Sequence, residues 1–206
     1  MPRPRFAKLD ADKQKAILTA AMEQFAARGY ERASFNRIIE QAGVSKGAMY
    51  YYFDDKEDLF NTTVEHAFEQ AFERVSALPD AATPEQFWQQ VHEFMIRALR
   101  FIRDEPLLAG LMKSVLSLHA AGSRIAAVDA VRTLYRQWAE GFIRNAQAVG
   151  AIRSDLPFDL LVGLVVAVAT AGDVWVVEHR AELEAGASDR VATQFLQMMR
   201  GAFGPR

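Results

Sequence analysis

The sequence has no cysteine among its 206 residues, which excludes disulfide-stapled scaffolds, thiolate metal sites, cysteine nucleophiles and iron–sulfur clusters. It also lacks an excess of charge of one sign, because 24 lysines and arginines offset 26 aspartates and glutamates and leave a net charge of -2. A surface that binds a polyanion everywhere is therefore not expected, and any nucleic-acid contact must come from a local basic patch. No apolar run follows the N-terminus, so no secretory signal is expected and the protein is predicted to be cytoplasmic.

Motifs of the common enzyme classes are missing as well. The four histidines, His66, His92, His119 and His179, do not have metal-ligand spacing. No serine sits in a nucleophile elbow, and no glycine-rich loop is present that could cradle a phosphate. We therefore expect a protein that is not an enzyme and that needs neither a metal nor another cofactor.

Strand patterns and hairpin turns are absent, and the apolar residues recur instead at intervals of three and four. Helix stops follow at Gly29 and Gly43, and residues 83–86, Thr-Pro-Glu-Gln, have the composition of a helix start. Half of the residues are hydrophobic, which is enough for a core without staples. The sequence predicts an all-α fold of about nine helices, in which a long helix from Asp55 joins an N-terminal three-helix domain to a C-terminal helical bundle.

The most informative segment spans residues 34–59, SFNRIIEQAGVSKGAMYYYFDDKEDL. Two short helices meet there at the turn Ala42-Gly43-Val44-Ser45, where the glycine can adopt a positive φ. This is the pattern of a helix-turn-helix, whose second helix enters the major groove of DNA.

The predicted second helix, residues 46–53, divides into two faces. Met49, Tyr52 and Phe53 form the core side. The outward side holds Lys46, Gly47, Ala48, Tyr50 and Tyr51. The two small residues let the backbone approach base edges, and the lysine can reach a phosphate or a guanine edge.

The segment resembles the DNA-binding domain of the TetR family of transcriptional regulators. The residues that carry the resemblance are Ala42 to Gly47, Tyr50, Tyr52, Phe53, Lys56 and Glu57, within a match from about Lys13 to Phe60. The resemblance implies phosphate contacts from Ser34, Arg37 and Lys56, and a recognition helix that starts at Ser45 and Lys46. It also implies that Gly47 and Ala48 lie nearest the bases and that Tyr50 and Tyr51 reach the backbone or base edges.

Two departures from the family pattern bear on the operator. The family often has Thr or Ser where this chain has Ala48, so an apolar contact replaces a hydrogen bond. It often has His at the position of Tyr51, so a phenol takes over that phosphate contact. Arg3, Arg5 and Lys8 precede the first helix and could form an arm into a groove, although such segments are more often disordered tails.

Aromatic and methionine side chains recur in the C-terminal part, where they line either a ligand pocket or an ordinary helical core. The candidate pocket residues are Trp88, Phe94, Met95, Phe101, Met112, His119, Trp138, Phe142 and Asp173. The polar ones among them are candidates to orient a ligand.

The last two predicted helices, about 158–183 and 188–203, carry wide apolar stripes that suit a four-helix dimer seam. The candidate interface residues are Leu160, Leu164, Val168, Ala171, Trp175, Val191, Phe195 and Met199. Asp159 and Asp173 bound the most apolar stretch, which is then shorter than the roughly 20 residues of a membrane crossing. No membrane association is expected.

The sequence thus predicts a homodimeric repressor with residues 1–55 as the DNA-binding domain and residues 56–206 as the ligand-binding and dimerisation domain. A small lipophilic or aromatic effector would release it from a palindromic operator by moving the long helix. Two alternatives stay open: a helical-bundle carrier or enzyme without a DNA role, and a helical protein anchored in a membrane through residues 160–177.

Overall fold

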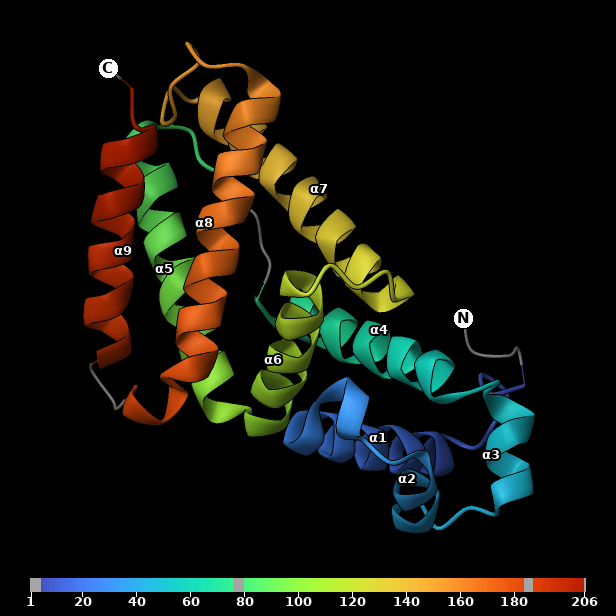
Figure 1. The fold of residues 1–206 in the computed structure, drawn as a ribbon. Coiled ribbons are helices and arrows are strands. Elements are labelled where there is room, and N and C mark those ends of the chain that lie inside the picture. The colour runs from blue at the N-terminus through green and yellow to red at the C-terminus, as the bar shows by residue number, and fades with distance from the viewer. Residues whose placement is uncertain (1–4, 76–79, 184–186, 206) are drawn as a thin grey trace. The chain divides into compact units, whose positions relative to one another are not determined.

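The computed structural model describes residues 5–75, 80–183 and 187–205, and the side chains of residues 72–75 are not described. Its helices are α1 (Ala11–Arg32), α2 (Phe35–Gln41), α3 (Lys46–Tyr52), α4 (Lys56–Val75), α5 (Pro84–Asp104), α6 (Pro106–Ala120), α7 (Ala126–Ala148), α8 (Phe158–Glu178) and α9 (Ala187–Phe203), with a short 3-10 helix, η1 (Arg180–Glu182), after α8 (Figure 1). The described residues contain nine α-helices and no strand, which confirms the predicted all-α fold.

The helix starts follow from the local sequence. At α4, the Asp55 carboxylate accepts a hydrogen bond from the Asp58 amide at 2.9 Å, and the Asp58 carboxylate accepts one from the Asp54 amide at 3.2 Å. At α5, the Thr83 hydroxyl accepts a hydrogen bond from the Gln86 amide at 3.2 Å. The bonds to Asp58 and Gln86 satisfy amides that the first turn of a helix leaves without partners, and the bond to Asp54 ties down the residue before the cap of α4.

The chain forms two compact units, one within residues 1–72 and 105–130 and the other within residues 73–104 and 131–206. The first unit therefore holds α1 to α3, most of α4, all of α6 and the start of α7. This division by contact does not coincide with the functional boundary predicted after residue 55, which stays a prediction.

The core of the first unit forms where α1, α3 and α4 meet. The Phe25 and Phe60 side chains are fully buried, and their ring centroids lie 4.8 Å apart in an edge-to-face arrangement. Ile17, Met49 and Phe53 are also fully buried. The apolar stripes of three helices thus converge on one core, as their spacing in the sequence predicts.

Helix α6 packs directly on α1 within the same unit (Figure 1). A Cβ atom at Gly110 would lie 2.6 Å from the Cβ of Ala26, so only glycine permits this approach. The Ser114 hydroxyl accepts a hydrogen bond from the Tyr30 amide at 3.0 Å. Helix α6 therefore belongs to the structural unit that carries the helix-turn-helix.

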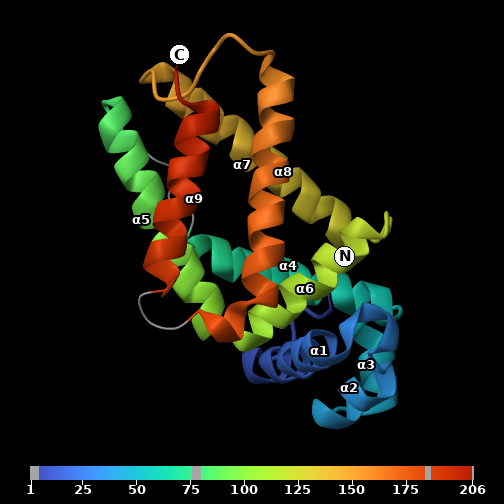
Figure 2. The ribbon, with the colours of Figure 1, turned by 60° about the vertical axis from the view of Figure 1, so that its left-hand side comes forward.

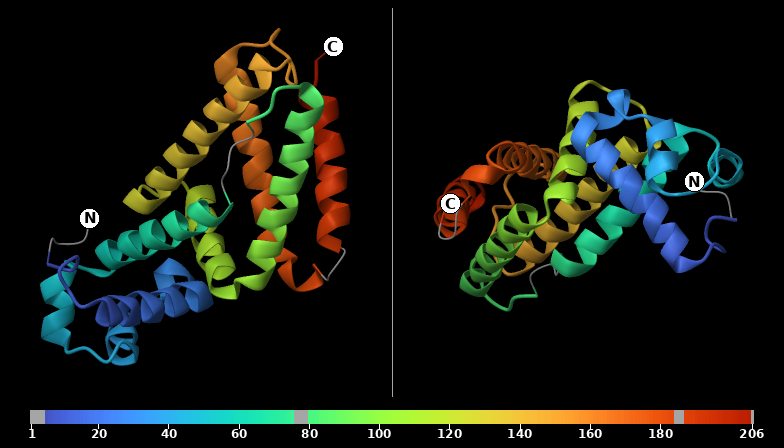
Figure 3. Two further views of the ribbon diagram at one scale, coloured as in Figure 1. Left: turned by 180° about the vertical axis from the view of Figure 1, so that it is seen from behind. Right: turned by 90° about the horizontal axis from the view of Figure 1, so that it is seen from below.

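In the second unit, α5 and α9 lie side by side, and α7 and α8 complete the packing (Figures 2 and 3). The shared core includes Phe87, Ile143, Leu161 and Val165, all fully buried. Apolar burial of this kind is the main stabilising contribution in a helical bundle.

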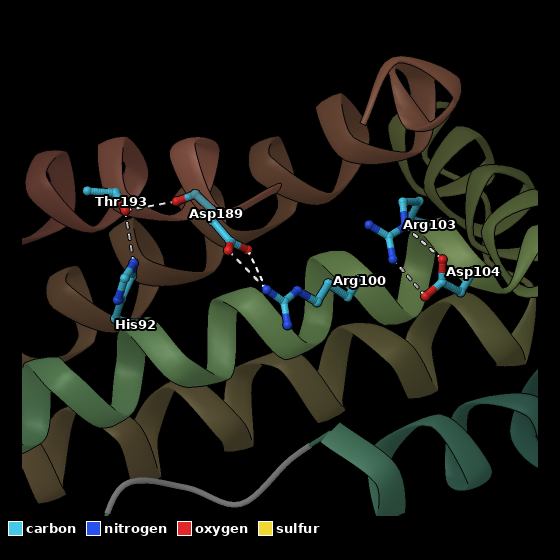
Figure 4. A network of polar contacts seen from close by, with 6 residues as sticks. All are labelled: His92, Arg100, Arg103, Asp104, Asp189 and Thr193. Atoms are coloured by element: carbon cyan, nitrogen blue, oxygen red, sulfur yellow. Dashed lines mark hydrogen bonds and ion pairs between the residues drawn. The ribbon is translucent and has the colours of Figure 1, made fainter. Parts of the chain in front are cut away.

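A polar network crosses the outer side of the α5–α9 contact (Figure 4). The Arg100 guanidinium donates to both carboxylate oxygens of Asp189 at 2.9 and 3.0 Å. The imidazole of His92 lies 3.0 Å from the hydroxyl of Thr193. Because the side chains of Arg100 and Asp189 remain largely accessible to solvent, their ion pair contributes little to stability.

Helix α8 corrects one expectation about the membrane. It is 21 residues long, and its most apolar 18-residue window has a mean hydropathy of 2.2, which makes it long and apolar enough to cross a bilayer by length and composition. The argument from a short apolar stretch therefore fails, because the helix extends beyond both Asp159 and Asp173. One such helix is weak evidence for a membrane protein, since helices of bundle cores and interfaces pass the same test.

Candidate DNA-binding interface

The two short helices α2 and α3 begin at serine caps. The Ser34 hydroxyl accepts a hydrogen bond from the Arg37 amide at 3.4 Å, and the Ser45 hydroxyl accepts one from the Ala48 amide at 3.1 Å. Gly43, in the turn between the helices, has a φ of +66°, which L-residues rarely adopt. The predicted helix-turn-helix is present, and its local sequence explains both helix starts and the turn.

The two faces of α3 match the prediction in part, because Tyr52, expected in the core, and Ala48, expected on the outer face, are both half-buried. Met49 and Phe53 are fully buried, whereas Tyr50 and Tyr51 are 44% and 48% exposed. Gly47 is exposed, and a Cβ atom there would meet nothing within 4 Å. The outer face therefore combines an open stretch of backbone with two accessible phenol rings.

Positive charge borders this face. Lys46 is exposed at the start of α3, with its ammonium 6.0 Å from the ring centroid of Tyr50. Arg37 is exposed on α2, while Ser34 and Ala48 are half-buried. The arrangement suits a phosphate backbone, because cations at the edge of a helix face can reach the strands that flank a groove.

Lys56 departs from the expected phosphate contact. Its ammonium donates to the carbonyl oxygens of Tyr30, Glu31 and Ala33 at 2.8, 3.1 and 3.4 Å and lies 4.6 Å from the ring centroid of Tyr30. Gly29, with a φ of +70°, interrupts α1, and Tyr30 and Glu31 lie in its last turn, where a helix leaves carbonyls without intrahelical partners. The lysine therefore joins the end of α1 to the start of α4, a role that the sequence motif does not reveal.

The structure distributes the nine candidate pocket residues over both units. Met112 and His119 lie on α6 in the first unit, and the other seven lie in the second. Trp138 stacks on Phe94 and on Phe142, with ring centroids 6.1 and 5.2 Å apart. Trp88 and Phe142 are only 2% exposed and belong to the core of the second unit. For these two residues the structure shows core packing, and a ligand-lining role stays a prediction.

Asp173 is the candidate pocket residue with the most unusual environment. Its carboxylate accepts a hydrogen bond from the Tyr135 hydroxyl, which comes from α7. Burial raises the pKa of Asp173 to about 6, although the hydrogen bond from Tyr135 opposes the shift. Burial, together with the charge of Asp173, raises the pKa of Tyr135 well above its usual value. Sequence reasoning missed Tyr135, because nothing in its local pattern indicates a polar partner 38 residues away.

The candidate interface residues on α8 are mostly accessible, but one on α9 is not. Leu160, Leu164 and Trp175 are 48%, 41% and 42% exposed. Met199 is only 4% exposed and lies in the core of its own unit, which corrects its assignment to an outer seam. Its neighbour Met198 is the exposed methionine, at 45%. One residue along a helix turns a side chain by about 100°, which is enough to exchange the two roles.

The other candidate interface residues have mixed positions. Ala171 is exposed on α8, and Val191 is half-buried on α9. Val168 and Phe195 pack partly against the core of the second unit. A Cβ atom at Gly172 would lie 3.2 Å from the ring of Phe195. Phe195 therefore contributes to the packing of α8 on α9 within one chain.

Comparison with known proteins identifies the N-terminal segment. Residues 17–63 match the family described as bacterial regulatory proteins, tetR family. The chain is 30% identical over 198 residues to the HTH-type transcriptional repressor BepR of Brucella suis biovar 1, and the match covers 94% of this chain and 79% of BepR.

Solved structures share the whole fold. A TetR family transcriptional regulator from Chloroflexus aurantiacus superposes with a TM-score of 0.69 at 22% identity, and the match covers 100% of both chains. The transcriptional regulator FadR of Bacillus subtilis, solved in complex with stearoyl-CoA, also gives a TM-score of 0.69, at 19% identity over 90% of this chain and 96% of FadR. These similarities extend beyond the helix-turn-helix to the C-terminal helices.

Proposed function

Because this chain belongs to the TetR family and is a DNA-binding transcriptional regulator, we propose that it is a repressor that a small apolar molecule releases from a palindromic operator. The observation that carries the proposal is the outer face of α3, where exposed backbone at Gly47 lies between accessible tyrosines and a lysine. A recognition helix needs such a face to approach base edges.

We assign the DNA contacts residue by residue. Gly47 and Ala48 approach the bases, and the backbone contacts come from Ser34, Arg37, Ser45, Lys46 and Tyr50, with Tyr51 beside them on the same face. For Lys56 we propose a positioning role in place of a phosphate contact, since its ammonium already satisfies three carbonyl oxygens. It would hold α4 against α1 and so keep the helix-turn-helix in a fixed orientation within its unit.

In this proposal the protein binds DNA as a homodimer whose two copies pair through α8 and α9. Only 28% of the most apolar window of α8 is buried within the chain, which leaves an apolar face for a partner. A second copy would cover Leu160, Leu164, Ala171, Trp175 and Met198. Two-fold symmetry would then place two recognition helices about 34–36 Å apart, one turn of DNA, and would require a palindromic site.

The effector of the proposed repressor binds in the C-terminal part. The aromatic and methionine side chains of the second unit suit a lipophilic or aromatic molecule, and the similar structure of FadR holds stearoyl-CoA. To move the protein from 1% to 99% released, the effector must favour the released state by about 5.5 kcal/mol. We retain the division into residues 1–55 for DNA binding and 56–206 for effector binding and dimerisation.

The proposal places the protein in the cytoplasm, with DNA as its partner and without a catalytic step. An electrophoretic mobility shift on the upstream region of its own gene tests it, with Lys46→Ala as the impaired variant. The wild-type protein should give one discrete complex that carries two chains. Mass spectrometry of copurifying small molecules then identifies candidate effectors. A true effector should dissociate the protein–DNA complex. If no sequence competes better than random DNA, the operator proposal fails.

A further inference from the structure

The short turn before α1 is anchored at the end of the recognition helix. Phe6 is only 4% exposed, and its ring centroid lies 4.8 Å from that of Phe53 and 6.3 Å from that of Tyr52. The Leu9 amide donates to the Phe6 carbonyl at 3.0 Å, and the Gln14 side chain donates to the Leu9 carbonyl at 2.6 Å. This turn is therefore tied to both α3 and α1.

The anchored turn presents an arginine to α3. The guanidinium carbon of Arg5 lies 4.4 Å from the ring centroid of Tyr51. Both side chains are exposed, and Tyr51 itself contacts the ring of Tyr52 at a centroid distance of 5.3 Å. Among the residues that the structure describes, no carboxylate forms an ion pair with Arg5. The arginine thus carries a positive charge that another molecule can neutralise.

The position of Tyr51 places this charge beside the face proposed to meet DNA. Gly47 and Tyr51 are four residues apart and so lie on one stripe of α3, next to the stripe of Lys46 and Tyr50. A guanidinium that stacks through its flat face keeps the N–H groups at its edge available for hydrogen bonds. Such an edge matches the two oxygens of a phosphate.

We propose that Arg5 binds a DNA phosphate next to the recognition helix and that the ring of Tyr51 positions its guanidinium for that contact. The inference rests on the proposed function, because it requires the outer face of α3 to meet the duplex. In this role the hydroxyl group of Tyr51 does not contact a phosphate. The ring acts as a platform, and the hydroxyl is dispensable.

The test uses the full-length protein and an operator selected by the wild-type chain from random DNA duplexes. Arg5→Ala should weaken binding about tenfold in 50 mM salt, as expected for a charged hydrogen bond. The slope of log affinity against log salt should fall by about 0.9 for each bound chain, so that the deficit per chain shrinks about 3.5-fold between 50 and 200 mM salt. The loss should be uniform over operator variants, because phosphates carry no sequence information.

Substitutions of Tyr51 separate the ring from the hydroxyl. Tyr51→Phe should bind as the wild type does, and Tyr51→Leu should lose as much affinity and salt slope as Arg5→Ala. In the Tyr51→Leu background, Arg5→Ala should have little further effect. Arg144→Ala is the matched control, because it removes an arginine that lies 5.1 Å from the ring centroid of Phe158 in the other unit. It should leave DNA binding unchanged.

Three results would overturn the inference. Arg5→Ala could bind with unchanged affinity and salt slope, Tyr51→Phe could lose as much as Tyr51→Leu, or Arg5→Ala could alter sequence preference. In each case Lys46→Ala still reports on the proposed function. If Lys46→Ala weakens binding, only the role of Arg5 fails. If it does not, the assignment of α3 as the recognition helix fails as well. Unchanged melting temperatures of all variants verify that each one is folded.

Discussion

Helices α3 and α8 each expose more than one large hydrophobic side chain, and they do so in opposite chemical settings. On α3 the exposed rings of Tyr50 and Tyr51 each lie near a cation, Lys46 or Arg5. On α8 the exposed large hydrophobic side chains are Leu160, Leu164, Val174 and Trp175, and between Leu160 and Gly172 the sequence has no charged residue. Exposed apolar area is typical of contact surfaces, and we propose a contact surface in both places. The neighbouring charge then distinguishes a surface that suits a polyanion from one that suits another apolar surface.

The largest effect is expected for a substitution on the outer face of α3. Gly47→Leu places a side chain in open space, so the fold should tolerate it, and the loss of a helical glycine should stabilise the protein by about 0.5–1 kcal/mol. The same side chain would hold the helix away from the bases, and operator affinity should fall at least 100-fold. Chemical denaturation and a mobility shift measure the two effects. A stable variant that binds normally would contradict the assigned groove contact.

The second prediction tests the exposed apolar face of α8 as a dimer interface. Leu164→Glu adds a charge to an exposed apolar face, which should shift a dimer to monomers by at least tenfold in dissociation constant. Sedimentation velocity measures the change. Leu107→Glu on α6 is the matched control, since Leu107 is also exposed, at 37%, but lies in the other unit. Equal dimer dissociation constants for the two variants would rule out α8 as the dimer interface.

The third prediction concerns Asp173, the half-buried carboxyl group of α8. Because burial raises the pKa of Asp173 from 3.8 to about 6, the folded protein holds a proton that the unfolded chain releases between these pH values. This contribution to stability is complete below about pH 4 and is lost as the pH rises through 6, by up to about 3 kcal/mol. Asp173→Asn should match the wild type near pH 4 and exceed it at pH 7.

Urea denaturation at a series of pH values measures this difference. The comparison with Asp173→Asn is needed because other carboxyl groups titrate too: the hydrogen bond from Arg103 lowers the pKa of Asp104, which changes stability in the opposite direction. A difference between the two proteins that does not depend on pH would contradict a buried, titrating Asp173.

The smallest effects are expected for the serine caps of α2 and α3 in the helix-turn-helix. Ser45→Ala removes the cap of α3 and should cost about 1 kcal/mol of stability. Ser34→Ala should cost less, because its bond to the Arg37 amide is longer, 3.4 Å against 3.1 Å. Thermal unfolding of both variants measures the order. The reverse order would show that hydrogen-bond length is not the deciding factor.

Much of the fold and part of the candidate interface could be predicted from the sequence. The helix starts at Asp55 and Thr83, the turn at Gly43 and the two faces of α3 follow from residues that are neighbours in the chain. The unit to which α6 belongs could not be predicted, because it depends on the close approach of Gly110 to Ala26.

The amino-acid sequence by itself determined the all-α architecture and the helix-turn-helix, because caps, glycine turns and apolar spacing act over a few residues. Only the tertiary structure decided the partners of particular side chains. The Lys56 ammonium donates to carbonyls at the end of α1, the Asp173 carboxylate accepts from the Tyr135 hydroxyl, and the Arg5 guanidinium lies over the ring of Tyr51. Such partners lie tens of residues apart, and which of them meet depends on how each helix is rotated and packed against its neighbours.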